Sequence, residues 1–263
     1  MSVRERLVKL REALVPLLFV PRCSACLEVL PSKNDALCEK CAEIYALESK
    51  YRCSACGRPH RFCTCKLEHD ERKTALVHIS AYDIKRNSVS KSMILNLKDT
   101  KYPGAFDFLA REMYETVRIR YPKIFDGGNL IVSYVPRSEK ARKGSGHDQS
   151  RELATRFANL SGAPVVRLFV NRSAKQQKKL DANERRANAN ANYVLADKNI
   201  DLAGRILILI DDITTTGASL GACASIARSA GVKTVIATVC ARAENKGSVN
   251  EEDYIIYGEE ENA

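Results

Sequence analysis

Two adjacent aspartates, Asp211 and Asp212, separate an apolar run from a threonine-rich turn. The run at 206–210 holds five aliphatic residues, which predicts a buried strand that stops at the aspartates. The turn precedes a predicted helix at 218–230, and its residues are Ile213, Thr214, Thr215, Thr216 and Gly217. Unpaired amides at a helix N-terminus favour a phosphate, and ligands of parallel sheets bind where strands end. The stretch predicts a phosphate site, with two carboxylates placed for sugar hydroxyls or Mg²⁺.

Two better-known phosphate motifs are missing from the sequence. No GxxxxGK[ST] occurs, which argues against a P-loop NTPase, and no GxGxxG opens a helix, which argues against a dinucleotide-binding domain. A buried strand followed by an ordinary capped helix remains the structural alternative. Two adjacent acids before three threonines exceed what a cap requires, so the ligand site is the favoured interpretation.

Eight of the ten cysteines lie between residues 23 and 65 in four short-spaced pairs. They are Cys23 and Cys26, Cys38 and Cys41, Cys53 and Cys56, and Cys63 and Cys65. Two such pairs can make a closed tetrahedral site of four thiolates, for which zinc is the expected metal. An iron–sulfur cluster and secreted disulfides are the alternatives, and nothing else in the sequence indicates secretion.

The eight cysteines can be grouped into two metal sites in more than one way. Sequential use gives one zinc to the first four cysteines and a second zinc to the last four, whereas a cross-braced pairing remains possible. His60 and His69 lie nearby and are expected on the surface. With all eight thiolates committed, neither zinc keeps an open position for water, so both should be structural.

Around these motifs, β-rich runs alternate with helical patterns, which predicts a parallel sheet covered by helices. The predicted strands are 75–82, 129–135, 165–168, 206–210, 234–241 and 254–257, and the predicted helices are 89–97, 105–120, 149–160 and 218–230. A short amphipathic helix is predicted at 3–14. Residues 1–70 are expected to form a helix and a double zinc ribbon, and residues 71–263 an α/β domain.

The charge and the composition restrict the function further. The formal net charge is +10, and the segment 134–192 holds 13 Lys and Arg against 5 Asp and Glu, as expected for a phosphate-rich ligand or, alternatively, a solvated face. No apolar run approaches the roughly 20 residues of a membrane span, so a cytoplasmic protein without membrane insertion is expected. Aromatic residues make up 6% of the chain, which counts against a purely DNA-binding protein.

The stretch 206–219, ILILIDDITTTGAS, resembles the 5-phosphoribosyl 1-diphosphate (PRPP) motif of type I phosphoribosyltransferases. Together with the eight cysteines, the whole chain resembles the ComF/GntX family. Ile94–Lys98 is similar to the family's leucine–lysine motif, and Pro136 through Gln149 to its proline and Arg-Gly-Phe-Asn-Gln region. Further family positions are matched by Gln177, Leu180, Arg185, Asn188 and Tyr193.

The resemblance implies a fold, a chemistry and a set of site residues. The fold is a small zinc-ribbon module followed by a type I phosphoribosyltransferase-like sheet flanked by helices. Asp211 and Asp212 would be catalytic and would orient Mg²⁺, and residues 213–217 would hold the 5-phosphate. Arg137 and Lys140 would meet the diphosphate, while a loop at 173–192 that carries Gln177 and Arg185 would close over the site.

The sequence also departs from the family pattern. Ser145, His147 and Asp148 replace the arginine, phenylalanine and asparagine of the family's basic region, and Thr215 occupies a position where some purine enzymes carry an aspartate. Two functions therefore stay open. One is a phosphoribosyltransferase, a glycosyltransferase that moves phosphoribosyl to or from a nucleobase. The other is a non-catalytic PRPP- or nucleotide-binding competence factor that acts in DNA uptake through a partner protein or single-stranded DNA. A homodimer is compatible with both.

Overall fold

The computed structural model describes residues 20–32, 35–53, 56–67, 74–82, 88–97, 103–138, 148–172 and 192–243. The predicted helix at 3–14 and the predicted strand at 254–257 lie outside these ranges. Within them, no helix is both long enough and apolar enough to cross a membrane.

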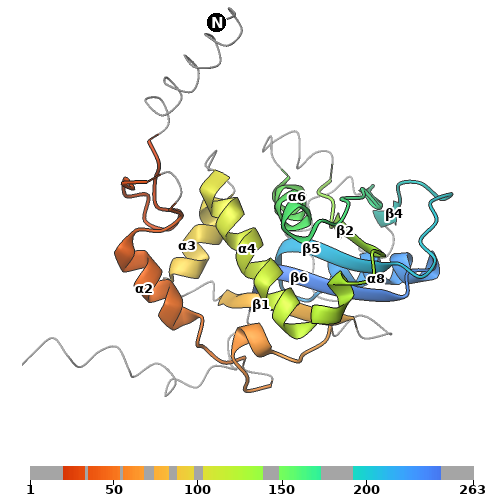
Figure 1. Cartoon of the computed structure of the whole chain (residues 1–263), viewed down its shortest axis with the longest axis horizontal. Helices are drawn as coiled ribbons and strands as arrows, with labels where there is room; N and C mark the ends of the chain where they lie inside the picture. The colour runs from red at the N-terminus through yellow and green to blue at the C-terminus, as the bar shows by residue number, and fades with distance from the viewer. Residues whose placement is uncertain are drawn as a thin grey trace, which may run out of the picture.

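Four parallel strands form the central sheet in the order β1-β6-β5-β2 (Figure 1). Their bounds are β1 (Ala75–Tyr82), β2 (Leu130–Tyr134), β5 (Ile206–Thr214) and β6 (Thr234–Ala243). The aliphatic run of β5 lies between two partners, and its last four residues are fully buried, as a central strand requires. The predicted fold class, a parallel sheet flanked by helices, is confirmed.

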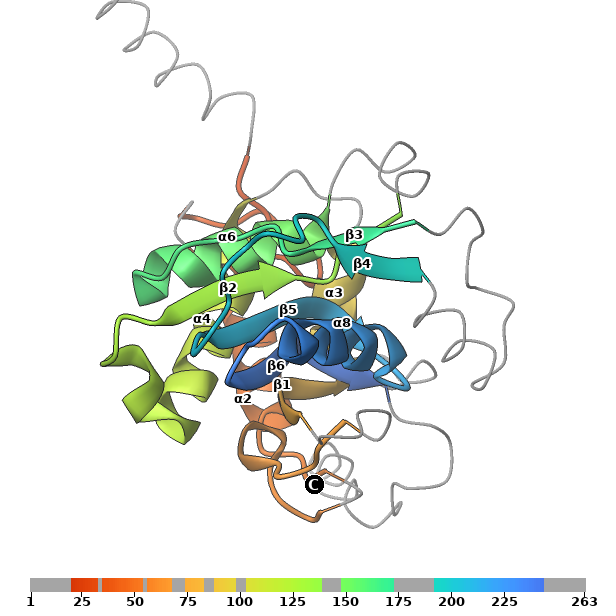
Figure 2. The ribbon, with the colours of Figure 1, turned by 90° about the vertical axis from the view of Figure 1, so that its right-hand side faces the viewer.

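Helices cover both faces of the sheet (Figure 2). One face packs against α3 (Val89–Asn96), α4 (Pro103–Arg120) and α6 (Gln149–Ser161), and this core is called the α4 core below. The other face packs against α8 (Ala218–Ser229), and this core is called the α8 core. The buried face of α8 carries four residues that are 0% exposed: Leu220, Cys223, Ala224 and Ala227.

Two strand predictions need correction. The segment 165–168 is no strand, because Val165 makes a single bridge to β2 and the amide of Leu168 donates to the Ser133 hydroxyl (3.3 Å) instead of a ladder carbonyl. The strand there is β3 (Phe169–Asn171), which pairs antiparallel with β4 (Tyr193–Leu195). The strand β5 also does not stop at the aspartates but pairs with β6 as far as Thr214.

The N-terminal part packs closely on the α4 core. Its helix α2 (Glu39–Glu48) places the Tyr45 ring edge-on to Phe108, with 5.2 Å between the ring centroids. At the end of α2, the Glu48 carboxylate accepts the first amides of α3, from Val89 (2.8 Å) and Ser90 (2.9 Å). A carboxylate from one part therefore caps a helix of the other, where the helix dipole favours it. A short 3₁₀ turn, η1 (His60–Phe62), follows, and a second, η2 (Pro122–Phe125), precedes β2.

Candidate functional site

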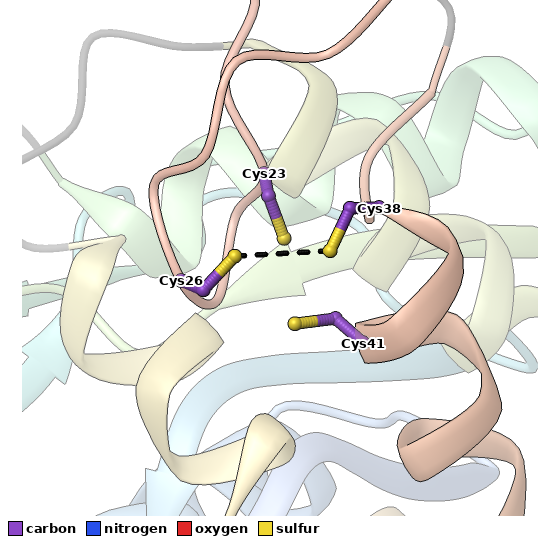
Figure 3. Close-up of side chains that lie close together, drawn as sticks. All are labelled: Cys23, Cys26, Cys38 and Cys41. Atoms are coloured by element: carbon purple, nitrogen blue, oxygen red, sulfur yellow. Dashed lines mark hydrogen bonds between the residues drawn. The ribbon is translucent and has the colours of Figure 1, made fainter.

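The eight paired cysteines gather into two clusters. The first cluster is formed by Cys23, Cys26, Cys38 and Cys41 (Figure 3), and the second cluster by Cys53, Cys56, Cys63 and Cys65. Within each cluster all four sulfurs lie within 4.8 Å of one another. The sequential pairing predicted from the chain order is confirmed, and the cross-braced alternative is wrong.

The spacing of the sulfurs fits a zinc ion. The distances between sulfurs are 3.7 Å for Cys26 and Cys38, 3.8 Å for Cys53 and Cys65, and 3.6 Å for Cys56 and Cys63. A tetrahedron with zinc–sulfur bonds of about 2.3 Å has edges of about 3.8 Å. Disulfide sulfurs lie only about 2.05 Å apart, and all these cysteines are free. Each cluster can therefore hold one zinc ion through four thiolates, which would leave no position for water.

One thiol in each cluster has a lowered pKa. Burial raises the pKa of Cys23, but hydrogen bonds from the amides of Cys26 and Cys38 outweigh it, and the pKa falls to about 7. Burial also raises the pKa of Cys56, but hydrogen bonds from the amides of Arg58 and Thr64 outweigh this effect, and the pKa falls to about 6. Peptide N–H groups thus favour a thiolate in each cluster before any metal contributes.

The predicted ligand site lies where β5 meets α8. The strand ends at Thr214, which is 5% exposed, and the β5–α8 loop of residues 215–217 leads into the helix. Gly217 occupies the N-cap position with a φ of 75°, in the left-handed region that glycine favours. No side chain in the described ranges caps the helix at this residue, and the Ala218 amide next to it donates to the Thr216 hydroxyl at 3.4 Å.

The loop amides are therefore available to a ligand. Among the described residues, the backbone N–H groups of Thr215, Thr216 and Gly217 donate to no protein acceptor. Such groups at the opening of a twelve-residue helix are the arrangement that binds anions.

Asp211 is the more constrained of the two aspartates. Its Oδ1 accepts the Ser150 hydroxyl at 2.7 Å and the Asp212 amide at 3.0 Å. Burial raises the pKa of Asp211 well above its ordinary value, the Asp212 carboxylate raises it further, and the Ser150 hydroxyl acts in the opposite direction. The two carboxylates thus form a partly buried acidic edge, which a divalent cation would neutralise.

Three further positions that the family resemblance singled out lie near the two aspartates: Arg137, Asp148 and Tyr193. Burial raises the pKa of Asp148, the N-cap of α6, while the amide of Arg151 and the charge of Arg137 lower it and the Asp212 charge raises it. Tyr193 is 5% exposed; burial raises its pKa, and a hydrogen bond with the Ser219 hydroxyl opposes this effect. The structure therefore brings Arg137 and Tyr193 to the same end of the sheet as the aspartates.

Some predicted residues lie outside the described ranges. They are Lys140, His147, Gln177 and Arg185, together with most of the expected closing loop and with His69. The assignment of PRPP-contacting roles to these residues stays a prediction.

One expectation about the surface is wrong. His60 is 1% exposed, and its Nδ1 lies 3.2 Å from Nδ1 of His78 on β1, which is also buried. Burial lowers the pKa of His60 to about 4, and the charge of Arg242 acts in the same direction. His60 is thus a neutral packing residue between the second cluster and the sheet.

Sequence reasoning missed two residues at the site. Ser150 is recognised only once α6 is seen to begin beside β5. A usable signal existed: Ser150 is a polar residue in the first turn of the helix that follows β2. The carboxyl ends of parallel strands meet at one edge, so such a residue can reach the aspartates at the end of β5. Leu67 gave no signal, because nothing in its neighbours along the chain places it against Gly217.

Together, the elements define a class of protein: two N-terminal four-cysteine clusters followed by a phosphoribosyltransferase-type parallel sheet. A chain that combines these clusters with this sheet is ComF-like. It is similar to the Competence protein ComFC of Bacillus subtilis (strain 168), with 25% identity over 199 residues that cover 71% of this chain and 75% of that protein. No protein-family model matches the chain.

Two phosphoribosyltransferases are among the solved structures with partial likeness to the chain. A purine phosphoribosyltransferase from Pyrococcus horikoshii is 15% identical, with 54% of this chain and 75% of that chain covered and a TM-score of 0.34. An adenine phosphoribosyltransferase from Thermoanaerobacter pseudethanolicus is 13% identical, with 58% and 85% covered and a TM-score of 0.35.

Proposed function

We propose that this ComF-like protein binds PRPP together with Mg²⁺ at the carboxyl end of β5. The observation that supports the proposal is the β5–α8 loop, whose amides have no protein acceptor in the described ranges and lie beside two carboxylates. An anionic phosphate and a cation bound to polyhydroxylated ribose match these two neighbouring features.

In this proposal the loop holds the 5-phosphate. The amides of residues 215–217 point to the phosphate oxygens, the α8 dipole adds a favourable field, and the threonine hydroxyls donate further hydrogen bonds. Gly217 lets the backbone take the left-handed conformation that opens the helix, since its φ is 75°. Ile213 is the last residue but one of β5 and pairs with Ala241 of β6, so it joins the loop to the sheet.

The aspartates bind the ribose and the cation. Asp211 is oriented by the Ser150 hydroxyl, and Asp212 places its Oδ1 2.8 Å from the Ile213 amide. Two carboxylates held this firmly are suited to accept the ribose hydroxyls and to ligate Mg²⁺ directly or through water. The cation would also lower the pKa of Asp211 towards its ordinary value.

The reaction that this site would serve is phosphoribosyl transfer. The C1–O bond of PRPP breaks, its electrons leave with the diphosphate, and a nucleophile bonds to C1 of an oxocarbenium-like ribose. Arg137 and Lys140 would neutralise the diphosphate, and the loop that carries Gln177 and Arg185 would exclude water. Catalysis of this kind depends on positioning and charge, so it needs no covalent enzyme intermediate.

Titration calorimetry of the full chain with PRPP and Mg²⁺ tests the proposal. Wild type should bind, and Asp211→Asn combined with Asp212→Asn should weaken binding at least about 100-fold, because two charge-assisted contacts are lost. Asp126→Asn is the matched control. This exposed aspartate lies between η2 and the start of β2, at the amino ends of the strands and not at the carboxyl ends where the site lies. Equal affinity in wild type and the double variant would contradict the assignment.

A second candidate function is non-catalytic. The relative from Bacillus subtilis is named a competence protein, and the β5–α8 loop carries Thr215 where a loop-borne acid could serve as a base. The protein would then sense PRPP or a nucleotide and act in DNA uptake through a partner protein or single-stranded DNA. Diphosphate release from PRPP with candidate bases distinguishes the enzyme from the sensor. Band shifts of single-stranded DNA at two salt concentrations test the DNA arm, since phosphate contacts weaken steeply with salt.

A further inference from the structure

The chain that leaves the second cluster packs directly on the β5–α8 loop. Leu67 lies two residues after Cys65, is 3% exposed and belongs to the α8 core. The three atoms nearest to the position where Gly217 would carry a Cβ all belong to Leu67, and its Cδ2 lies 2.8 Å from that position. The left-handed glycine that opens α8 is therefore covered by a side chain from the cysteine-rich part.

Residues 65–67, called the strap below, are held at both ends. At one end Cys65 contributes its sulfur to the second cluster, 3.8 Å from that of Cys53. At the other end the Leu67 amide donates to the Thr74 carbonyl at 3.1 Å, and Lys66 bridges to the first residue of β1. The Arg228 guanidinium of α8 donates to the Thr74 hydroxyl.

A strap this short has little freedom. Three residues span at most about 10 Å, so a shift of the Cys65 sulfur moves Leu67 unless the backbone between them rearranges. Gly217 has the least restricted backbone of the loop, and in the described ranges the closest contact at its open side is Leu67. Removal of that contact would release the residue whose conformation aims the loop amides.

We propose that Leu67 is a positioning residue that holds Gly217 in its helix-opening conformation, and that the strap thereby links the metal state of the second cluster to phosphate affinity at the β5–α8 loop. The ligand part rests on the proposed PRPP function, and the positioning part does not. Zinc in the second cluster would favour the binding-competent loop, and bound phosphate would in turn favour zinc retention, because linkage is reciprocal.

Hydrogen exchange of the zinc-loaded full chain tests the positioning part without any ligand. The Gly221 amide donates to the Gly217 carbonyl at 2.7 Å, so its exchange rate reports on the start of α8. Leu67→Ala should speed this exchange about tenfold because the loop loses its packing partner. Leu67→Met conserves the volume and should restore slow exchange.

Leu202→Ala is the matched control. Leu202 is 2% exposed in the same α8 core, but it lies beside Gly231, after the other end of α8. Its truncation should lower the melting temperature as Leu67→Ala does, yet leave Gly221 exchange unchanged. If Leu67→Ala does not fold, Leu67→Val supplies a smaller truncation with the same expected direction. Unchanged exchange in the Leu67 variants, or an equal change in Leu202→Ala, would overturn the proposal.

The metal part is tested in the same way. Cys65→Ser should lose one zinc and speed Gly221 exchange as Leu67→Ala does, and the double variant should exchange no faster than either single variant, since both act through one strap. Cys26→Ser, in the first cluster, should lose one zinc and leave Gly221 exchange unchanged. Additive effects of Cys65→Ser and Leu67→Ala would contradict a shared route.

Calorimetry with PRPP and Mg²⁺ then joins the two parts. Leu67→Ala and Cys65→Ser should each weaken binding about tenfold, whereas Leu202→Ala and Cys26→Ser should bind as wild type does. A wild type that binds no PRPP would contradict the proposed function alone, because the exchange rates still decide whether the strap positions Gly217. Normal PRPP affinity with fast Gly221 exchange would contradict the link to ligand affinity.

Discussion

The two four-cysteine clusters have the same ligands and nearly the same sulfur spacing, yet they join the sheet in different ways. Cys23 and Cys41 of the first cluster belong to the α4 core, beside Leu30 and Tyr45. The second cluster belongs to neither core, although Cys53 and Cys63 are buried, and the strap carries Leu67 into the α8 core. The same four-cysteine unit is therefore part of a core in one place, and in the other it is followed by a residue that packs on the β5–α8 loop.

The largest effect should separate the clusters by stability. Cys41→Ser removes a ligand inside the α4 core and should lower the free energy of unfolding by about 4 kcal/mol, whereas Cys65→Ser should cost about 2 kcal/mol. Thermal unfolding with zinc analysis of the folded fraction measures both. Cys240→Ser changes a buried cysteine that belongs to neither cluster and should keep two zinc ions, whereas equal losses for Cys41→Ser and Cys65→Ser would break the comparison.

The next effect concerns a part of the site that belongs to neither cluster. Because burial and Asp212 raise the pKa of Asp211, the folded ligand-free protein binds a proton there more tightly than the unfolded chain does. Stability should fall as the pH rises from about 4 through the raised pKa. Asp211→Asn should flatten this fall and raise the melting temperature at pH 7, while PRPP affinity drops at least about tenfold.

Melting curves across this pH range measure the Asp211 effect. Asp126→Asn should retain the wild-type slope. A cluster variant such as Cys26→Ser should also retain it, and a changed slope there would show that the clusters and the acidic edge are coupled.

A third experiment sharpens the role of the strap. Gly217→Ala places a Cβ against Leu67 in a left-handed conformation and should cost about 2 kcal/mol of stability. Leu67→Ala in the same chain should relieve the clash, so the double variant should lose less than the sum of the single losses. Denaturant unfolding of the four chains measures the coupling, and strict additivity would show that the two residues do not meet.

The smallest effect concerns the anchor of the first cluster. The Asn96 side-chain amide donates to the carbonyls of Ser24 (2.9 Å) and Ala25 (3.0 Å), within the loop between two ligands. Asn96→Ala should cost about 1 kcal/mol of stability without changing Gly221 exchange. Faster exchange at Gly221 would mean that the first cluster also reaches the β5–α8 loop.

Periodicity predicted the elements well where side chains report on burial. The helix later seen as α8 and the sequential grouping of the cysteines both follow from local spacing. The end of β5 was missed because a strand is defined by backbone pairing, which continues past two charged side chains to Thr214. The helix α2 was not predicted, since its apolar residues are distributed around the helix and include the exposed Ile44.

Contacts between distant segments account for the remaining errors. His60 is polar and lies among cysteines, so its sequence neighbours indicate a surface position, whereas its burial depends on His78 in the next element. Leu67 and Gly217 are 150 residues apart, and no local pattern joins them. Tertiary packing determines where both side chains lie, and local sequence propensity does not predict such packing.

The strand order has a consequence for how the chain matures during synthesis. Within the described part of the chain, the one strand of the sheet that pairs with the edge strand β1 is β6, which follows the other three strands in the sequence. Until residues 234–243 have left the ribosome, β1 has no partner strand from this sheet, and the strap that bridges to it through Lys66 has no finished sheet to pack on. The cysteines, which emerge first, can take up metal long before that moment, so metal loading would precede assembly of the loop that the metal is proposed to control.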